Sequence, residues 1–253
     1  MIRLHPYTLL GAALAGFFAV NLAQAGTIQI PIHSGTGFFI NPQYIITNEH
    51  VLHDGCARIV IQDRGRDWAP AQIVVTDTAH DLALLHTQAW PRDTAALRRD
   101  FDELKTGDRI VAVGFPLETL AKNKDYEVAE GKLVDPLQSF GNSGVLQFSH
   151  VIKLGYSGGP LLDGAGKVIG VVKAMAKIYE TESVGGKLGK KKFVGEVDEA
   201  INLPTLEQFL MANNILYKTA PENESPGKGI DFTINVQCID PAGEGIASGI
   251  NNN

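Results

Sequence analysis

Short runs of apolar and β-branched residues, separated by glycine, proline and aspartate, recur between residues 27 and 172. Examples are residues 37–40, 44–47, 57–61, 73–75, 109–113 and 168–172. Short strands with frequent turn signals and few helical periods are typical of an all-β sandwich or barrel. The pattern therefore predicts an all-β fold and not a wound α/β sheet.

The pattern changes toward the C-terminus. Residues 204–213 predict a helix, with Pro204 at its start and apolar residues on one face. Residues 230–238 alternate apolar and polar positions with a period of two, which predicts a strand with Cys238 on its apolar face. We expect residues 218–229 to form a polar linker and the residues after Pro241 a flexible tail.

The first 25 residues have the pattern of a secretory signal peptide. Arg3 precedes an apolar run over residues 9–20, and Ala23-Gln24-Ala25 forms an A-x-A cleavage site. We expect the mature chain to start near Gly26, and no later run is apolar for long enough to span a bilayer. The sequence thus predicts an exported protein, periplasmic or secreted, with no membrane anchor after cleavage.

Charge and cysteine content narrow the function further. The formal net charge of −6 becomes −7 without the signal segment, which argues against nucleic-acid binding. The basic run at residues 187–192 is interpreted as a solvated loop. Cys56 and Cys238 are the two cysteines, and an oxidising compartment favours a disulfide between them over two buried thiols.

The stretch Gly155–Pro160, "GYSGGP", offers Ser157 as a nucleophile. A serine hydroxyl needs a base to remove its proton, which makes a histidine necessary. As G-x-S-x-G, the stretch fits an α/β-hydrolase, but that order requires a histidine after the serine. All seven histidines precede Ser157, so this reading is excluded. The order His, Asp, Ser remains available.

Three segments in this order resemble trypsin-like serine proteases, especially the bacterial HtrA-type branch. They are "IITNEHVL" (45–52), "DLALLH" (81–86) and "GYSGGPLLDGAGKVIGVV" (155–172), with further matches at "SGTGFFI" (34–40) and "GDRIVAVGFP" (107–116). The resemblance covers about residues 27–209. It implies two six-stranded antiparallel β-barrels, over residues 26–117 and 118–217, followed by residues 218–253 with an appended strand.

The resemblance also implies roles for individual residues. His50 takes the place of the general base, Asp81 that of the acid which orients it, and Ser157 that of the nucleophile. The backbone N–H groups of Gly155 and Ser157 take the place of the oxyanion hole. The implied function is endopeptidase action on polypeptide substrates through an acyl-enzyme. The alternative is a catalytically degenerate fold that serves as a binding module.

The same resemblance places Val151 at the base of the S1 pocket, with Ala174 and Met175 near its wall. No acid is expected at this base, so the pocket predicts small or medium aliphatic residues at P1. Lys173 leaves acidic P1 residues as an alternative. We expect no cofactor and no metal, because the pair His50 and His53 lacks a third ligand. The oligomeric state stays open.

The chain departs from the family pattern at three places. Tyr156 stands before the nucleophile where HtrA-type enzymes usually carry asparagine, and the bulky ring bears on the geometry of the oxyanion hole. Glu49 precedes His50 where a small residue is common. About forty residues follow the predicted helix, too few for the PDZ domain that HtrA proteins normally carry.

Overall fold

The structure of the protein is a computed structural model. It describes residues 31–52, 56, 58–64, 67–116, 118, 126–135, 144–184, 187–220 and 229–239. The expected signal peptide, His53, most of the expected linker and the tail after Pro241 lie outside these residues.

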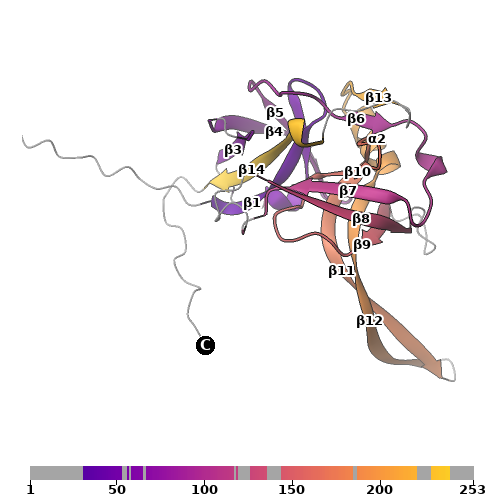
Figure 1. Ribbon diagram of the computed structural model, residues 1–253. Coiled ribbons are helices and arrows are strands. Elements are labelled where there is room, and N and C mark those ends of the chain that lie inside the picture. Colours follow the sequence, from indigo (N-terminus) through magenta and orange to yellow (C-terminus); the bar gives the residue numbers. More distant parts are fainter. Residues whose placement is uncertain are drawn as a thin grey trace, which may run out of the picture.

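The first barrel contains six strands. They are β1 (Pro31–Phe39), β2 (Tyr44–Thr47), β3 (Arg58–Gln62), β4 (Ala69–Asp77), β5 (Leu82–Thr87) and β14 (Thr233–Ile239). They close in the order β1-β14-β3-β4-β5-β2, with all neighbours antiparallel. This barrel is the indigo, purple and yellow part of Figure 1.

The second barrel is built from the middle of the chain. Its strands are β7 (Arg109–Gly114), β8 (Glu127–Asp135), β9 (Val145–Ser149), β10 (Pro160–Asp163), β11 (Val168–Val184) and β12 (Lys187–Asn202). They follow the order β10-β7-β8-β9-β12-β11, and the pairing of β10 with β11 closes the barrel. Strands β6 (Ala96–Arg98) and β13 (Lys218–Ala220) extend the same sheet. The predicted fold of two six-stranded antiparallel barrels is confirmed.

The C-terminal strand β14 is an integral part of the first barrel. It pairs with β1 on one side and with β3 on the other, so it closes the barrel instead of hanging from it. A disulfide joins Cys238 of β14 to Cys56, across 182 residues of sequence. The disulfide expected from the sequence is confirmed. The expectation that this strand is appended to the fold is wrong, because β14 is one of the six strands of the first barrel.

The two barrels also divide at a different residue from the one expected. Strands β6 and β7 precede residue 117, yet both belong to the second sheet. The chain leaves the first barrel after β5, which ends at Thr87. The apolar pattern of a strand reports which of its faces is buried but not which neighbour it pairs with, so the sequence did not locate this crossing.

The predicted helix is present as α2 (Leu203–Ala212), and the Oδ1 atom of Asn202 caps it by accepting the N–H of Thr205 at 3.0 Å. The described residues also contain three short 3-10 helices: η1 (Glu49–Val51), η2 (Phe101–Glu103) and η3 (Gly229–Asp231). Residues 187–192, expected as a loop, instead begin β12. Paired with β11, this strand forms an arm that projects from the second barrel (Figure 1).

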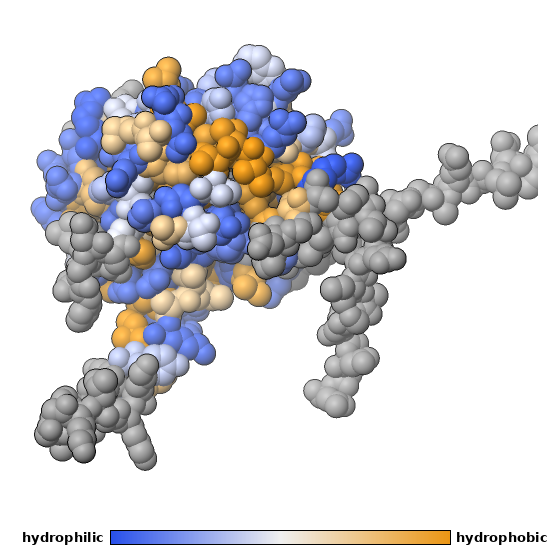
Figure 2. Space-filling model, turned by 180° about the vertical axis from the view of Figure 1, so that it is seen from behind, coloured by the Kyte–Doolittle hydropathy of each residue, from blue (hydrophilic) through white to orange (hydrophobic). Residues whose placement is uncertain are grey.

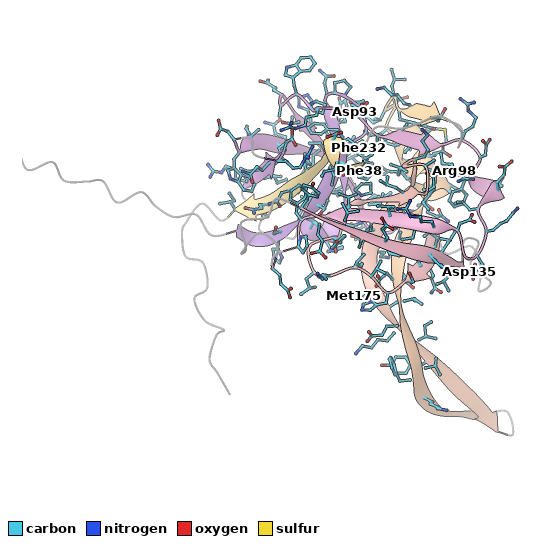
Figure 3. All side chains as sticks on the ribbon, viewed as in Figure 1. Phe38, Asp93, Arg98, Asp135, Met175 and Phe232 are labelled. Carbon is cyan, nitrogen blue, oxygen red and sulfur yellow. A yellow bond between two sulfur atoms is a disulfide. The ribbon has the colours of Figure 1, made fainter. Side chains whose placement is uncertain are left out.

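Each barrel encloses buried apolar side chains. Phe38 of β1 and Phe232 next to β14 are both buried and lie close together in the first barrel (Figure 3). In the second, Arg98 and Asp163 form a buried ion pair with 3.1 Å between Nη1 and Oδ2. Among the helices of the described ranges, none has both the length and the apolar character needed to cross a membrane.

Candidate active site

His50 and Asp81 come from neighbouring turns of the first barrel. His50 lies in η1, directly after β2, and Asp81 directly precedes β5, the strand that pairs with β2. The Nδ1 atom of His50 lies 2.8 Å from Oδ2 of Asp81 and 3.0 Å from Oδ1. The backbone N–H of His50 also donates to Oδ1 at 3.0 Å. The carboxylate therefore orients both the ring and the turn that carries it.

The backbone at Asp81 is itself held in an uncommon conformation. Its φ is 57°, in the left-handed region that aspartate tolerates better than most residues. Its carbonyl oxygen accepts hydrogen bonds from Nδ2 of Asn48 at 2.9 Å and from the N–H of Glu49 at 3.3 Å. Such strained positions persist only where surrounding contacts hold them, and they occur often at functional sites.

Ser157 faces the same cleft as His50 and Asp81, from the second barrel. The cleft has a volume of about 440 Å³, and its lining comprises His50, Asp81, Ile152, Lys153, Leu154, Ser157, Lys173, Ala174 and Met175. The hydroxyl of Ser157 donates to the carbonyl oxygen of Lys173 at 3.2 Å and not to His50. Rotation about one side-chain bond redirects this hydroxyl, and such contacts are often loose without substrate.

The loop around Ser157 requires glycine at two positions. Gly155 has a φ of 103°, and a Cβ atom there would lie 2.6 Å from the carbonyl oxygen of Phe115. Gly158 has a φ of 84°, and its Cβ would lie 2.2 Å from the carbonyl oxygen of Thr36. Within the described residues, the N–H groups of Gly155 and Ser157 donate no hydrogen bond.

Thr36 holds this loop against the first barrel, and the sequence did not single it out. Its hydroxyl donates to the carbonyl of Gly155 at 2.6 Å and accepts the N–H of Phe115 at 3.0 Å. Its own N–H donates to the carbonyl of Ser157 at 2.8 Å. Thr36 is fully buried, and Thr47 donates to its carbonyl oxygen at 2.7 Å. Thr36 lies within the segment "SGTGFFI", which the sequence analysis matched to the family as a strand without assigning a role to the threonine.

Tyr156 points away from the cleft. Its side chain is fully buried, and its ring occupies the space that the missing side chain of Gly114 leaves open: a Cβ there would lie 2.7 Å from the ring. Burial and the nearby negative charge of Glu127 raise the pKa of the Tyr156 hydroxyl. Among the described residues, this hydroxyl has no hydrogen-bond partner.

Asp198 anchors the segment that leads into the nucleophile loop, and no sequence signal marked it. Its Oδ2 accepts the N–H groups of Val151 at 2.7 Å and Ile152 at 2.9 Å. Its Oδ1 lies 2.8 Å from Nδ1 of His150, whose Nε2 lies 3.6 Å from Glu196. Asp198 is fully buried and does not belong to the lining of the cleft, so its carboxylate contacts the protein's own donors.

The residues expected around the S1 pocket separate in the structure. Ala174 and Met175 line the cleft together with Ile152, whereas Val151 is not among its lining residues. Lys153 also lines the cleft and bonds Glu127 with 2.7 Å between Nζ and Oε1. The hydrogen bond to Glu127 raises the pKa of Lys153. The lining of the cleft is thus largely apolar and includes two lysines, Lys153, which is paired with Glu127, and Lys173.

Comparison with known proteins identifies the family of this chain. A family model described as trypsin-like peptidase domain matches residues 35–171. The uncharacterized protein y4bJ of Sinorhizobium fredii is 34% identical over 185 residues, which cover 72% of this chain and 28% of that protein. The serine protease Do-like HtrB of Bacillus subtilis is 28% identical over 218 residues, covering 79% of this chain and 46% of HtrB.

A probable periplasmic serine endoprotease, DegP-like, of Bartonella henselae is 31% identical over 153 residues, covering 57% of this chain and 28% of that protein. Among solved structures, the HtrA-type protease AlgW with a decapeptide superposes with a TM-score of 0.55 at 26% identity, covering 70% of this chain and 50% of AlgW. The chain thus spans less than half the length of these curated relatives. By sequence and fold, this chain belongs to the trypsin-like peptidase family, with HtrA-type proteases among its relatives.

Proposed function

We propose that the protein is a serine endopeptidase in which Ser157, His50 and Asp81 form the catalytic triad. The observation that carries this proposal is the hydrogen-bonded pair of His50 and Asp81 in one cleft with Ser157. Because Nδ1 of His50 bonds Asp81, Nε2 is the ring nitrogen left to take the serine proton. His50 then returns the proton to the leaving amine, and water hydrolyses the acyl-enzyme.

The N–H groups of Gly155 and Ser157 are proposed as the oxyanion hole. Their lack of partners within the described residues, and the fixed backbone of Gly155, support this role. Removal of one such donor typically costs about 3–4 kcal/mol of transition-state stabilisation. Since Tyr156 packs under Gly114, its bulk stays out of this site.

For P1, we propose small or medium aliphatic residues. Ile152, Ala174 and Met175 supply an apolar wall, and the carboxylate of Asp198 is occupied by the chain's own donors. A peptide-library cleavage profile tests this: predominant cutting after Arg or Lys contradicts it, and cutting after Asp or Glu assigns the preference to Lys173.

A serine-directed fluorophosphonate tests the triad directly. The purified mature protein is expected to be labelled and to hydrolyse unfolded protein, and Ser157→Ala is expected to lose both properties with an unchanged circular dichroism spectrum. Equal hydrolysis by wild type and Ser157→Ala excludes the triad. A folded protein that neither reacts nor hydrolyses supports the binding-module alternative.

We also propose that the protein is exported after cleavage before Gly26. The disulfide between Cys56 and Cys238 supports an oxidising compartment. N-terminal sequencing of the protein recovered from the cell envelope or the medium is expected to begin at Gly26. Recovery of the intact chain from the cytoplasm contradicts export.

A further inference from the structure

The turn that carries His50 is capped by a residue from another part of the chain. Asn48 is the N-cap residue of η1, and an asparagine there ordinarily accepts, through Oδ1, the N–H of the second or third helical residue. Asn48 makes no such bond. The N–H of the second residue, His50, instead donates to Oδ1 of Asp81 at 3.0 Å, and the N–H of Glu49 donates to the carbonyl oxygen of Asp81 at 3.3 Å. Asp81 therefore caps η1 in place of Asn48.

The side chain of Asn48 makes a different contact. Hydrophilic residues cover much of the face seen in Figure 2, whereas Asn48 is fully buried. Its Nδ2 atom donates to the carbonyl oxygen of Asp81 at 2.9 Å, and its Oδ1 atom has no hydrogen-bond partner among the described residues. A buried polar atom without a partner lowers stability, and an apolar side chain of similar size avoids this cost. The reason for an asparagine at this position therefore lies in its bond to Asp81.

Asp81 needs this contact because its backbone conformation is unfavourable. Its φ of 57° lies in the left-handed region, which among the non-glycine residues of the described ranges is shared only by Asn214. Such a conformation costs free energy and persists where neighbouring groups hold it. Of the two donors to the carbonyl of Asp81, Nδ2 of Asn48 lies closer than the N–H of Glu49. The carbonyl and the carboxylate are attached to the same Cα atom, so a change in the backbone of Asp81 moves its carboxylate relative to His50.

Asn48 is itself held between the two barrels. A Cβ atom at Gly158, next to Ser157, would lie 2.9 Å from the backbone nitrogen of Asn48, so these two segments are in close contact. Asn48 also directly follows β2, which pairs with β5, the strand that Asp81 directly precedes. Asn48 thus lies between the turn of Asp81 and the loop of Ser157. It is not among the residues that line the cleft.

We propose that Asn48 is a positioning residue, whose amide holds Asp81 in the left-handed conformation in which the carboxylate bonds both the ring and the backbone of His50. This inference rests on the proposed function and adds to it a residue that touches no substrate. Without the amide, the carbonyl of Asp81 keeps only the longer bond from Glu49, and the carboxylate is free to move away from the imidazole. A displacement on the order of 1 Å at a catalytic group costs about 100-fold in rate.

The variant Asn48→Leu tests the proposal, because leucine has nearly the size of asparagine but no donor. We expect kcat on a fluorogenic peptide to fall by about 10- to 100-fold with KM unchanged, since the lining of the cleft is intact. The rate of labelling by fluorophosphonate should fall by the same factor. The midpoint of urea denaturation should stay close to that of the wild type, because the lost bond and the removed unpaired oxygen have opposite effects.

Asn235→Leu is the matched control. Asn235 is also fully buried in the first barrel, its Oδ1 accepts the hydroxyl of Ser34 at 3.3 Å, and its Nδ2 has no hydrogen-bond partner among the described residues. The change removes a buried amide of the same kind that does not bond Asp81, so kcat should stay at the wild-type value. An equal loss of kcat in Asn235→Leu would show that the loss comes from disturbed packing of the barrel, and this overturns the proposal.

A spectroscopic measurement reports on the pair directly. At low temperature, the proton between Nδ1 of His50 and the carboxylate of Asp81 is expected to give a far-downfield NMR signal in the wild type and in Asn235→Leu. In Asn48→Leu this signal should move upfield or vanish. If leucine does not fit the site, Asn48→Ala, which cannot overpack it, should show the same losses.

Three further results overturn the proposal: wild-type kcat in folded Asn48→Leu, an unchanged His50 signal in that variant, or a loss confined to KM. If neither variant at position 48 folds, the asparagine is required for the fold itself and the proposal is also overturned. Hydrolysis that requires Ser157 but does not depend on Asn48 refutes this inference alone. Equal hydrolysis by wild type and Ser157→Ala refutes the proposed function instead.

Discussion

Replacing Thr36 with valine removes a hydroxyl that joins the first barrel to the nucleophile loop. Valine has nearly the same shape, so the change deletes two hydrogen bonds: the one to the carbonyl of Gly155 at 2.6 Å and the one from the N–H of Phe115 at 3.0 Å. The backbone bond from Thr36 to Ser157 is retained. The variant therefore isolates the contribution of a single side-chain oxygen.

The structure sets the size of the expected effect. Gly155, Phe115 and Thr36 are all buried, so both former partners lose their bond without gaining water. A buried donor or acceptor left unpaired costs about 1–3 kcal/mol, which gives about 2–6 kcal/mol for the two groups. If the released Gly155 also no longer presents its N–H, kcat should fall on the order of 10²-fold, as for loss of one oxyanion donor.

The matched control is Thr36→Ser, which keeps the hydroxyl and loses one methyl group. Its expected cost is about 1 kcal/mol in the free energy of unfolding, with kcat within a few-fold of the wild type. Urea denaturation followed by circular dichroism measures stability, and kcat is measured on a short peptide with active sites titrated by fluorophosphonate. Equal kcat for Thr36→Val and Thr36→Ser, with both folded, would refute the positioning role of this hydroxyl.

Further predictions concern Asp198, the disulfide and Tyr156. Asp198→Asn should lower the free energy of unfolding by about 2 kcal/mol and raise KM more than it lowers kcat. The neighbouring Glu199→Gln should change neither the stability nor the kinetic constants. If Asp198→Asn instead lowers kcat more than it raises KM, the proposed anchoring of the cleft wall by Asp198 is contradicted. Reduction of the Cys56–Cys238 disulfide should lower the free energy of unfolding by up to about 5 kcal/mol, and an unchanged urea midpoint contradicts a role of the disulfide in closing the barrel. Tyr156→Phe should raise the free energy of unfolding by about 1 kcal/mol, and a decrease indicates that the hydroxyl has a partner. Because the pKa of Tyr156 is raised in the folded state, wild-type stability should fall as the pH rises above 10, and Tyr156→Phe should show less of this fall.

Local patterns in the sequence were sufficient for many of the elements and for the resemblance to the family. Short apolar and β-branched runs between turn residues predict many of the strands, the period-two alternation of residues 230–238 predicts β14, and proline at the helix start with apolar residues on one face predicts α2. The order of the segments around His50, Asp81 and Ser157 separates this family from α/β-hydrolases. These features are readable because a strand or helix shows its buried face in consecutive residues, and because catalytic loops have narrow backbone requirements.

Only the tertiary structure decided which elements meet. It placed β14 between β1 and β3, assigned β6 and β7 to the second sheet, and turned the basic run at residues 187–192 into part of a projecting arm. It also revealed Thr36 and Asp198, whose partners lie 119 residues and about 47 residues away in sequence. In the sequence, Asp198 resembles any polar residue of an alternating strand. The hydrogen-bond partners of a buried polar side chain are set by which distant segments the fold brings together. The spacing of residues along the chain does not reveal these partners.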